Sequence, residues 1–439
     1  MKRFEGMHFY INIPNFNAVV MDEEVKTGKV NHSIHALDTF FSMIESFGKS
    51  HFDSFVVEKI TGSRLHMYVI DSINDAFSVV AEVSKYAYLL SSFMSEEIGK
   101  YKSLKQFSVQ VGACFGRFFD FEFTYGDMIE ETTIGYTANF AAKLQGIAAP
   151  SNIAISANIY EGINIEHQKQ FTKLKDPKLD KYEQKYYAAA PISKLITRID
   201  FQSDLEASKQ YANNVNLTDI RFPEVRQTVN FANISRKYCR KIEGIPFFAD
   251  VRGFTTQFDK DDSNLDEMAK TTSDILTTMF RAVTKQHGVH IQFQGDREMA
   301  LFHNYPGYDC VIDAVQTGLR LIDEVKQYSV SIGIGESLGT LFAAKIGARG
   351  EKDNILLGAT VTEADKFEDE CAGENQLVVS ADIFGKIKAV KPLWANHFSK
   401  VGTNCYRITV GFEKLLEVCS TKQLTNNNRQ QNYNKAWGE

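Results

Sequence analysis

The sequence has little of what several protein classes require. Its six cysteines are scattered, with no close pair and no C-x-x-C motif, which argues against a zinc cage or a disulfide scaffold and fits a reducing compartment. No run of about 18 uncharged apolar residues occurs, and the first residues lack the apolar core of a signal peptide. Basic residues number 49 against 55 acidic ones, so no overall positive charge favours nucleic acid or anionic lipid.

What is present is ordinary globular material in a long chain. The 439 residues are 44% hydrophobic and 24% charged. This is enough for more than one buried core and too long for one compact domain. We therefore expect a cytoplasmic protein of two or three domains, with no membrane-spanning helix and no nucleic-acid partner.

The two halves of the chain repeat one another. IAISANIYEGI at 153–163 matches LVVSADIFGKI at 377–387, with an apolar strand, a Ser-Ala pair and the start of a helix in each. Three further pairs of blocks match in the same order, namely 9–16 with 248–255, 57–69 with 291–302, and 132–146 with 355–369. Four matched blocks in one order indicate a tandem duplication.

The duplication predicts the domain organisation. We call residues 1–195 the first copy and residues 241–412 the second copy. Residues 196–240 have no counterpart and are rich in Asn, Arg and Ser, so they are predicted to connect the copies. Residues 413–439 end in an Asn/Gln-rich stretch and are predicted to form a polar tail.

Each copy alternates strand-like and helix-like segments. A strand leads into a helix whose apolar residues recur every three to four positions, followed by a hairpin, a second helix and a glycine-containing strand. The segments are 7–13, 32–47, 53–71, 75–95 and VQVGACFG in the first copy, and 245–251, 265–286, 289–303, 308–326 and VSIGIG in the second. This alternation predicts an α/β fold, an α+β sandwich with helices packed over a sheet, in each copy.

Two carboxylates of the second copy fall at predicted strand ends. Asp250 ends a strand that continues into Arg-Gly, and Asp296 lies at the bend of the hairpin. Two carboxylates at adjacent strand ends are suited to a pair of Mg²⁺ ions, which prefer oxygen ligands and bridge substrate phosphates. The first copy has Asn12 and Ser63 at the same places, and these neutral side chains cannot supply the charge for a metal pair.

These blocks resemble a known family. FADVRGFT (248–255) with QGDREMALF (294–302) resembles the two metal-binding signatures of class III nucleotidyl cyclases, and IGYTANFAAKLQ (134–145) resembles that family's ribose and transition-state segment. The resemblance implies the ferredoxin-like class III cyclase fold, with the active site between two domains arranged head to tail. It implies conversion of a nucleoside triphosphate to a 3′,5′-cyclic nucleotide and pyrophosphate, with two Mg²⁺ or Mn²⁺ ions.

The resemblance also assigns residues. Asp250 and Asp296 are expected to bind the metals, and the segment Gly253, Phe254 and Thr255 to cradle the outer phosphates, aided by Lys175 or Lys178. From the first copy, Lys59 and Thr132 fall at the base-reading positions. Asn139 falls at the ribose-positioning place, and Lys143 replaces the family's usual transition-state Arg. A lysine keeps the charge but loses the planar fork.

The opposite combination of copies is incomplete. The second copy has Gln292, Thr362 and Lys366 at the base, ribose and transition-state places, and the first copy lacks the metal aspartates. One complete half survives in each copy. We therefore expect a monomeric pseudo-heterodimer with one working site and one relic.

The base-reading pair leaves more than one substrate open. Lys59 with Thr132 resembles the pair of some bacterial adenylate cyclases, in which Lys donates to a ring nitrogen and Thr accepts from an amino group. Cytosine offers a similar edge, whereas guanine fits less well because Lys59 can only donate. With no sensor domain beside the copies, the chain is similar to the stand-alone pyrimidine cyclases of bacterial anti-phage (Pycsar) systems, where a separate effector reads cCMP or cUMP. We expect CTP ahead of UTP, with ATP as the alternative.

Two other functional classes remain open at this point. A catalytically inactive pair would bind a nucleotide and act as a sensor or scaffold, which the lysine at position 143 favours and the intact aspartate pair disfavours. A two-metal phosphotransferase of the polymerase type would share a related metal site, but the charge balance indicates no basic surface for a template.

Overall fold

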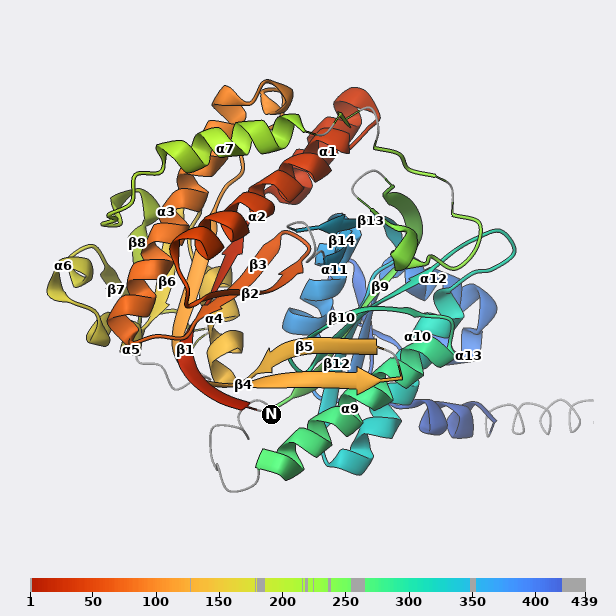
Figure 1. Ribbon diagram of the computed structural model, residues 1–439. Helices are drawn as coiled ribbons and strands as arrows, with labels where there is room; N and C mark the ends of the chain where they lie inside the picture. Colours follow the sequence, from red (N-terminus) through yellow and green to blue (C-terminus); the bar gives the residue numbers. More distant parts are fainter. Residues whose placement is uncertain are drawn as a thin grey trace, which may run out of the picture.

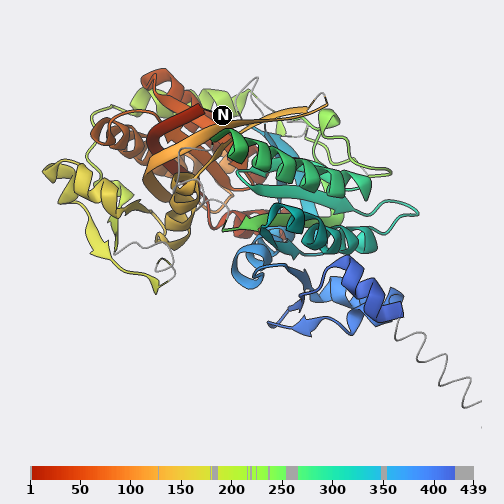
Figure 2. The same cartoon turned by 90° about the horizontal axis from the view of Figure 1, so that it is seen from below.

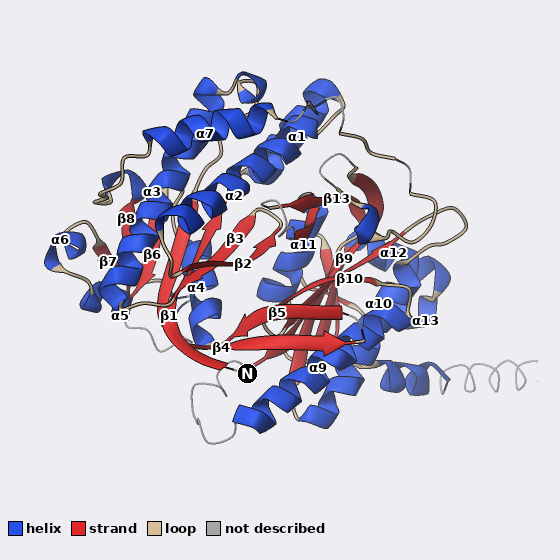
Figure 3. Ribbon diagram, viewed as in Figure 1, coloured by secondary structure: helices blue, strands red, loops and turns tan. Residues whose placement is uncertain are grey.

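Figure 1 shows the computed structural model of the chain. It describes residues 2–420 except 127, 178, 180–185, 215, 218–219, 224, 236–237, 254–264 and 348–352. The strands of this part of the chain form two sheets, with helices packed around both (Figure 3).

The first sheet belongs to the first copy. Its strand order is β2-β3-β1-β4-β6-β8-β7, with β5 paired to β4. The strands are β1 (Lys2–Asn12), β2 (Phe55–Thr61), β3 (Arg64–Val69), β4 (Gln110–Tyr125), β5 (Met128–Ile134), β6 (Asn152–Ser156), β7 (Thr172–Leu174) and β8 (Tyr187–Pro191).

The second sheet repeats this order. It runs β10-β11-β9-β12-β15-β17-β16, with β13 paired to both β14 and β9. The strands are β9 (Arg240–Arg252), β10 (Val289–Gln294), β11 (Arg297–His303), β12 (Ser331–Glu336), β13 (Gly339–Ile346), β14 (Asp353–Leu357), β15 (Gln376–Ser380), β16 (Ser399–Lys400) and β17 (Cys405–Ile408). The matching orders support the duplication inferred from the sequence.

Helices cover both faces of each sheet. In the first copy the alternation of β1 sends Met7, Phe9 and Ile11 into the core under α2 (Asn31–His51) and α3 (Ile73–Glu97). Tyr10 faces the opposite side, where α4 (Tyr136–Ile147) packs. The corresponding helices of the second copy are α9 (Leu265–Lys285), α10 (Val311–Glu324) and α11 (Ala359–Lys366), which continues as a π-helical turn at Phe367–Cys371.

Each copy extends a two-stranded arm into the core of the other. The β4–β5 arm buries Phe119, Phe121 and Phe123 in the cluster of the second copy, and Figure 2 shows it reaching over that copy. In return, the β13–β14 arm buries Phe342 and Ile355 in the cluster of the first. Fully burying one phenylalanine contributes roughly 1.5–3 kcal/mol, so the exchanged arms hold the copies together.

Remaining helices pack around these cores. They are α1 (Phe16–Thr27), α5 (Ala157–Gly162), α6 (Ile165–Gln168), α12 (Ala381–Val390) and α13 (Pro392–Ala395). No helix in the described ranges is both long and apolar enough to cross a membrane.

Two predicted boundaries look different in the structure. The predicted connection at 196–240 contains helix α7 (Gln202–Asn213), which contacts α2 and α3 and buries Ala212 in the first core. Residues 412–420 are helical and bury Leu415 and Cys419 in the second core, although 413 was the predicted start of the polar tail. Both segments read as polar because only a few of their residues face a core.

Candidate functional site

Two neighbouring strands of the second copy bring Asp250 and Asp296 together. Asp250 lies near the end of β9, opposite Arg297 of β11. Asp296 precedes Arg297 in the β10–β11 turn, where Gly295 has φ +66°, a left-handed conformation that glycine adopts without strain. The sequence prediction that these two carboxylates meet at adjacent strand ends therefore agrees with the register.

The environments of the two carboxylates differ. Asp296 is 3% exposed, and its pKa lies well above the ordinary value because of burial and the nearby Asp250. Burial also raises the pKa of Asp250, an effect that Arg252 and Arg297 oppose. Arg252 Nη1 donates to Asp250 Oδ2 at 2.9 Å. Asp250 therefore has a cationic partner, whereas Asp296 has no ion pair with a described residue.

This donor set fits a divalent metal. A buried carboxylate without a counter-ion, facing a second carboxylate, is electrostatically unfavourable unless a cation lies between them. Mg²⁺ and Mn²⁺ prefer carboxylate oxygens, with the remaining positions taken by water or phosphate. Asp250 and Asp296 are the residues that would hold such ions.

Helix α4 of the first copy faces this pair of carboxylates. Asn139 and Lys143 lie one helical turn apart, on one face of the helix. Lys143 Nζ pairs with Asp369 of the second copy, and its charge lowers the pKa of Asp250. Asn139 is partly exposed and has no hydrogen bond to a described residue. The structure therefore brings Lys143 to the aspartates and leaves the Asn139 amide available.

The two predicted base-reading residues are buried where the copies meet. Lys59 is 5% exposed, and its Nζ donates to Glu130 Oε1 at 2.6 Å and to the carbonyl of Phe293 at 2.5 Å. Thr132 is 1% exposed, and its Oγ1 accepts from the Gly295 amide at 2.9 Å. Both therefore contact the hairpin that carries Asp296, and these contacts occupy the polar groups that the sequence analysis assigned to base reading.

The predicted phosphate-binding residues are only partly described. Gly253 has φ +71°, which suits a turn in which backbone amides point at an anion. Phe254, Thr255 and Lys178 lie outside the described residues. Lys175 is exposed just after β7, the edge strand of the first sheet, and has no contact with the other site residues that the structure describes.

Sequence reasoning missed the charged residues that frame the aspartates. Glu368, in the π-helical turn, pairs with Arg252 and with Arg297, each at 2.7 Å. Arg297 also pairs with Asp365 at 2.6 Å. π-Helical turns often occur at functional sites, and the acidic sequence DKFEDE at 365–370 was the signal that could have indicated this one.

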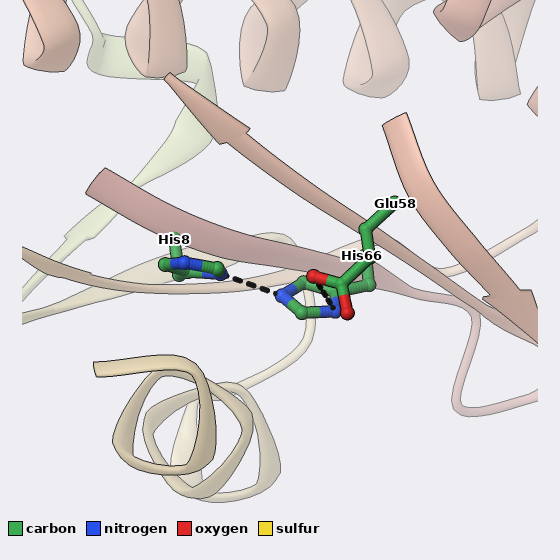
Figure 4. Close-up of side chains that lie close together, drawn as sticks. All are labelled: His8, Glu58 and His66. Atoms are coloured by element: carbon green, nitrogen blue, oxygen red, sulfur yellow. Dashed lines mark hydrogen bonds and ion pairs between the residues drawn. The ribbon is translucent and has the colours of Figure 1, made fainter. Parts of the chain in front are cut away.

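A second cluster of metal-ligand residue types lies in the first copy. Figure 4 shows His8, His66 and Glu58, which come from β1, β3 and β2. Glu58 Oε2 lies 3.0 Å from His66 Nδ1, and His8 Nδ1 lies 2.8 Å from His66 Nε2. Because the two partners contact opposite nitrogens of His66, the three side chains form a hydrogen-bonded line rather than a convergent ligand set.

The histidines of this line are neutral at pH 7. Burial, assisted by neighbouring positive charge, lowers the pKa of His8 and of His66 to about 3. His66 Nδ1 faces a carboxylate, so it carries the proton, and His66 Nε2 then accepts from His8 Nδ1. Glu58 therefore receives a hydrogen bond from this line.

Solved structures show which fold this is. Neither a protein-family model nor a curated protein matches the sequence. A class III adenylyl cyclase-like ATP-binding protein from Pseudomonas aeruginosa matches with a TM-score of 0.66 and 17% identity, over 94% of this chain and 90% of that one. The adenylyl cyclase CyaB from P. aeruginosa matches 40% of this chain and 97% of its own, with 19% identity and a TM-score of 0.34.

The first of these matches extends over both copies. Its coverage and TM-score agree with the two sheets of matching strand order. The predicted α/β fold is therefore confirmed: the chain has the class III nucleotidyl cyclase fold, present as two tandem copies.

Proposed function

We propose that the protein is a nucleotide cyclase with one active site, built from the aspartates of the second copy and helix α4 of the first. The observation that supports the proposal is geometric: Asp250 and Asp296 lie at the ends of neighbouring strands of the second copy, and Lys143 of the first copy reaches Asp369 of the second and lowers the pKa of Asp250. The matching place in the relic combination has Asn12 and Ser63, which hydrogen-bond to each other.

The proposed reaction is intramolecular. The ribose 3′-hydroxyl gives up its proton to water as its oxygen attacks the α-phosphorus, the bond to the pyrophosphate oxygen breaks, and a 3′,5′-cyclic nucleotide and pyrophosphate result. Bound Mg²⁺ or Mn²⁺ would supply Lewis acidity, lowering the pKa of the 3′-hydroxyl and neutralising phosphate charge. Asp250 and Asp296 would hold the ions.

The first copy supplies groups that touch the sugar and the reacting phosphate. The Asn139 amide orients the ribose, which places the 3′-oxygen in line with the α-phosphorus. Lys143 neutralises charge that develops on the reacting phosphate. It exchanges Asp369 for the phosphate when substrate binds, because one ammonium group cannot fully serve both anions.

The proposed substrate is a pyrimidine triphosphate, CTP ahead of UTP, with ATP as the alternative. Lys59 as donor and Thr132 as acceptor suit a ring nitrogen beside an amino group. In a cell, the product would act on a separate cyclic-nucleotide effector in antiviral defence. That role rests on the similarity to stand-alone pyrimidine cyclases alone.

A second candidate is a nucleotide-binding protein that does not catalyse cyclisation. Lys143 in place of arginine favours it, as does the similarity over nearly the whole chain to a protein described as cyclase-like and ATP-binding. The aspartate pair favours the enzyme, because a protein that only binds nucleotide has less need of two metal carboxylates.

Incubation with each of the four nucleoside triphosphates and Mg²⁺ or Mn²⁺ tests the proposal. Mass spectrometry would follow the products, and the Asp250→Asn/Asp296→Asn variant is the control. We expect a cyclic nucleotide and equimolar pyrophosphate from the wild type and neither from the variant. Bound but unchanged nucleotide would favour the second candidate.

A further inference from the structure

Glu58 is a buried carboxylate that the proposed reaction does not use. It lies on β2 beside Lys59, and its side chain is 7% exposed. Four groups meet its two oxygens. Oε1 accepts from the Thr133 amide at 2.8 Å and lies 3.4 Å from the Thr132 hydroxyl, while Oε2 meets the Thr133 hydroxyl at 2.5 Å and His66 Nδ1 at 3.0 Å.

These contacts fix the direction of the Thr132 hydroxyl. A backbone N–H can only donate, so Glu58 Oε1 is an acceptor. The Thr132 hydroxyl therefore donates to Glu58, and this uses its single hydrogen. Towards the second copy its oxygen can then only accept, and there the Gly295 amide donates to it at 2.9 Å.

The hairpin of the second copy indicates what these positions bind. Lys59 meets an acceptor, the Phe293 carbonyl, and Thr132 meets a donor, the Gly295 amide. A ring nitrogen beside an exocyclic amino group, as in cytosine and adenine, presents the same two kinds of group. Glu58, Lys59 and Thr132 all belong to the first copy, so their arrangement persists when a base takes the place of the hairpin contact.

The second copy lacks this arrangement. Ile291 precedes Gln292 just as Glu58 precedes Lys59, and Ile355 stands where Thr132 does. Both are buried apolar residues. The carboxylate that orients a hydroxyl therefore occurs only in the copy that is proposed to read the base.

We propose that Glu58 determines base specificity by holding Thr132 as a hydrogen-bond acceptor, so that the site takes a nucleoside triphosphate with an amino-bearing base, cytosine or adenine, and rejects uracil. Glu58 is a positioning residue, because it acts through Thr132. This inference rests on the proposed nucleotide site. It goes further by separating CTP from UTP through a named residue.

Equilibrium binding of 3′-deoxy-CTP and 3′-deoxy-UTP with Mg²⁺ tests the inference without catalysis, because both analogues lack the attacking hydroxyl. Wild type is expected to prefer the cytosine analogue. Glu58→Met removes the acceptor and is expected to reduce that preference roughly tenfold, the effect of one hydrogen bond. Glu58→Gln keeps a side-chain oxygen for the Thr133 amide and the Thr132 hydroxyl, so it is expected to keep the preference.

The matched control is Glu131→Met, an exposed glutamate beside Thr132, which is expected to leave the ratio of affinities unchanged. If Glu58→Met does not fold, Thr132→Val and Thr132→Ser replace it, and only the valine should lose the preference. A folded Glu58→Met with the wild-type ratio, or a Glu58→Gln that loses it, overturns the inference.

The same titrations separate this inference from the proposed function. A Glu58-dependent preference in a protein that forms no cyclic product supports the inference and contradicts the cyclase. Cyclic product from a wild type that binds both analogues equally supports the cyclase and contradicts the inference about Glu58. Because the inference also admits adenine, 3′-deoxy-ATP is titrated alongside, and failure to bind any of the three analogues contradicts both.

Discussion

The hairpin ends of the two copies share a framework and differ in charge. In each, a carboxylate on the other copy's arm accepts a hydrogen bond from a backbone amide of the hairpin. Glu130 Oε1 accepts from the Phe293 amide at 2.7 Å, and Asp353 Oδ2 accepts from the Ile60 amide at 2.6 Å. In the second copy, the strand ends carry Asp250 and Asp296, and burial together with the charge of Asp250 raises the pKa of Asp296. In the first, Ser63 Oγ donates to Asn12 Oδ1 at 3.0 Å.

Keeping two adjacent carboxylates lowers the stability of the metal-free fold. Two neutral side chains that hydrogen-bond to each other stabilise the fold, whereas two neighbouring carboxylates, of which Asp296 is buried, oppose it unless a cation binds. The shared framework holds both hairpins in place, so the framework alone does not identify the working one. The pair of neighbouring carboxylates, Asp250 and Asp296, is the feature that supports placing the proposed site at the hairpin of the second copy.

Removing the carboxylates should have the largest effect. Asp250→Asn/Asp296→Asn is expected to lower cyclic-nucleotide formation by at least about 1000-fold, because the metal ligands are lost. The same variant should unfold at a higher temperature than the metal-free wild type. Product analysis and thermal unfolding in EDTA measure the two effects. Ser63→Ala is the matched control, and an equal loss of activity there would contradict the assignment of the relic.

The next largest effect on activity is expected at the two lysines that occupy the predicted transition-state positions, Lys143 and Lys366. Lys143→Ala is expected to slow cyclisation about 100-fold, the usual effect of losing one charge-stabilising donor. Lys366→Ala, at the equivalent position of the relic combination, is expected to leave the rate unchanged. Initial rates at saturating nucleotide make the comparison. Lys143→Arg should keep activity, since it retains the charge and adds a planar fork, and equal losses at Lys143 and Lys366 would mean that neither position is special.

The histidines of the two copies should respond oppositely to pH. His66 is neutral when folded, with a pKa of about 3 against 6.5 unfolded. Its contribution to the free energy of unfolding is therefore complete above pH 6.5 and is smaller by about 2 kcal/mol at pH 5, because the unfolded chain then binds a proton that the folded protein does not. His290 lies between Glu130 and Glu298, and its pKa is raised to about 9. The ion pairs of His290 contribute fully to the free energy of unfolding below pH 6.5, and this contribution is lost as the pH rises towards 9.

Urea unfolding of wild type, His66→Gln and His290→Gln at pH 5, 7 and 9 measures this opposition. His66→Gln should reduce the loss of stability between pH 7 and 5, and His290→Gln should reduce the loss between pH 7 and 9. Identical pH profiles for the two variants would show that the charge states of the two histidines do not differ.

The smallest effect is expected within the relic site. Ser63→Ala removes the hydrogen bond to Asn12 and should lower the free energy of unfolding by about 1 kcal/mol. Urea unfolding at pH 7 checks the value. A more stable Ser63→Ala would mean that the Asn12–Ser63 contact does not stabilise the relic.

Local pattern predicted the elements and indicated candidate site residues. The predicted strands, hairpins and helices of both copies agree with the structure because the apolar periodicity within each segment decides them. The blocks that carry Asp250, Asp296 and Lys143 were also identified from sequence; the two aspartates lie at neighbouring strand ends, and Lys143 pairs with Asp369 of the same copy as the aspartates. Their catalytic roles remain a prediction.

The rest depends on contacts between distant segments. Nothing local to Lys59 shows that Glu130 and Phe293 would enclose it, because one partner lies on an arm and the other on the second copy. Likewise, Glu58 is an ordinary glutamate in its own strand, and only the fold brings Thr132, Thr133 and His66 to its two oxygens. Exchange of the arms between copies could not be predicted from one sequence for the same reason.

The number of nucleotides bound per chain distinguishes one nucleotide site from two. Isothermal titration of the wild type with 3′-deoxy-CTP and Mg²⁺ is predicted to give one nucleotide per chain, and the Asp250→Asn/Asp296→Asn variant to give none. Two nucleotides per wild-type chain would mean that the site lined by Asn12 and Ser63 binds nucleotide as well. Full binding by the variant would mean that Asp250 and Asp296 are not needed for binding. Either result would contradict a single site built on these aspartates.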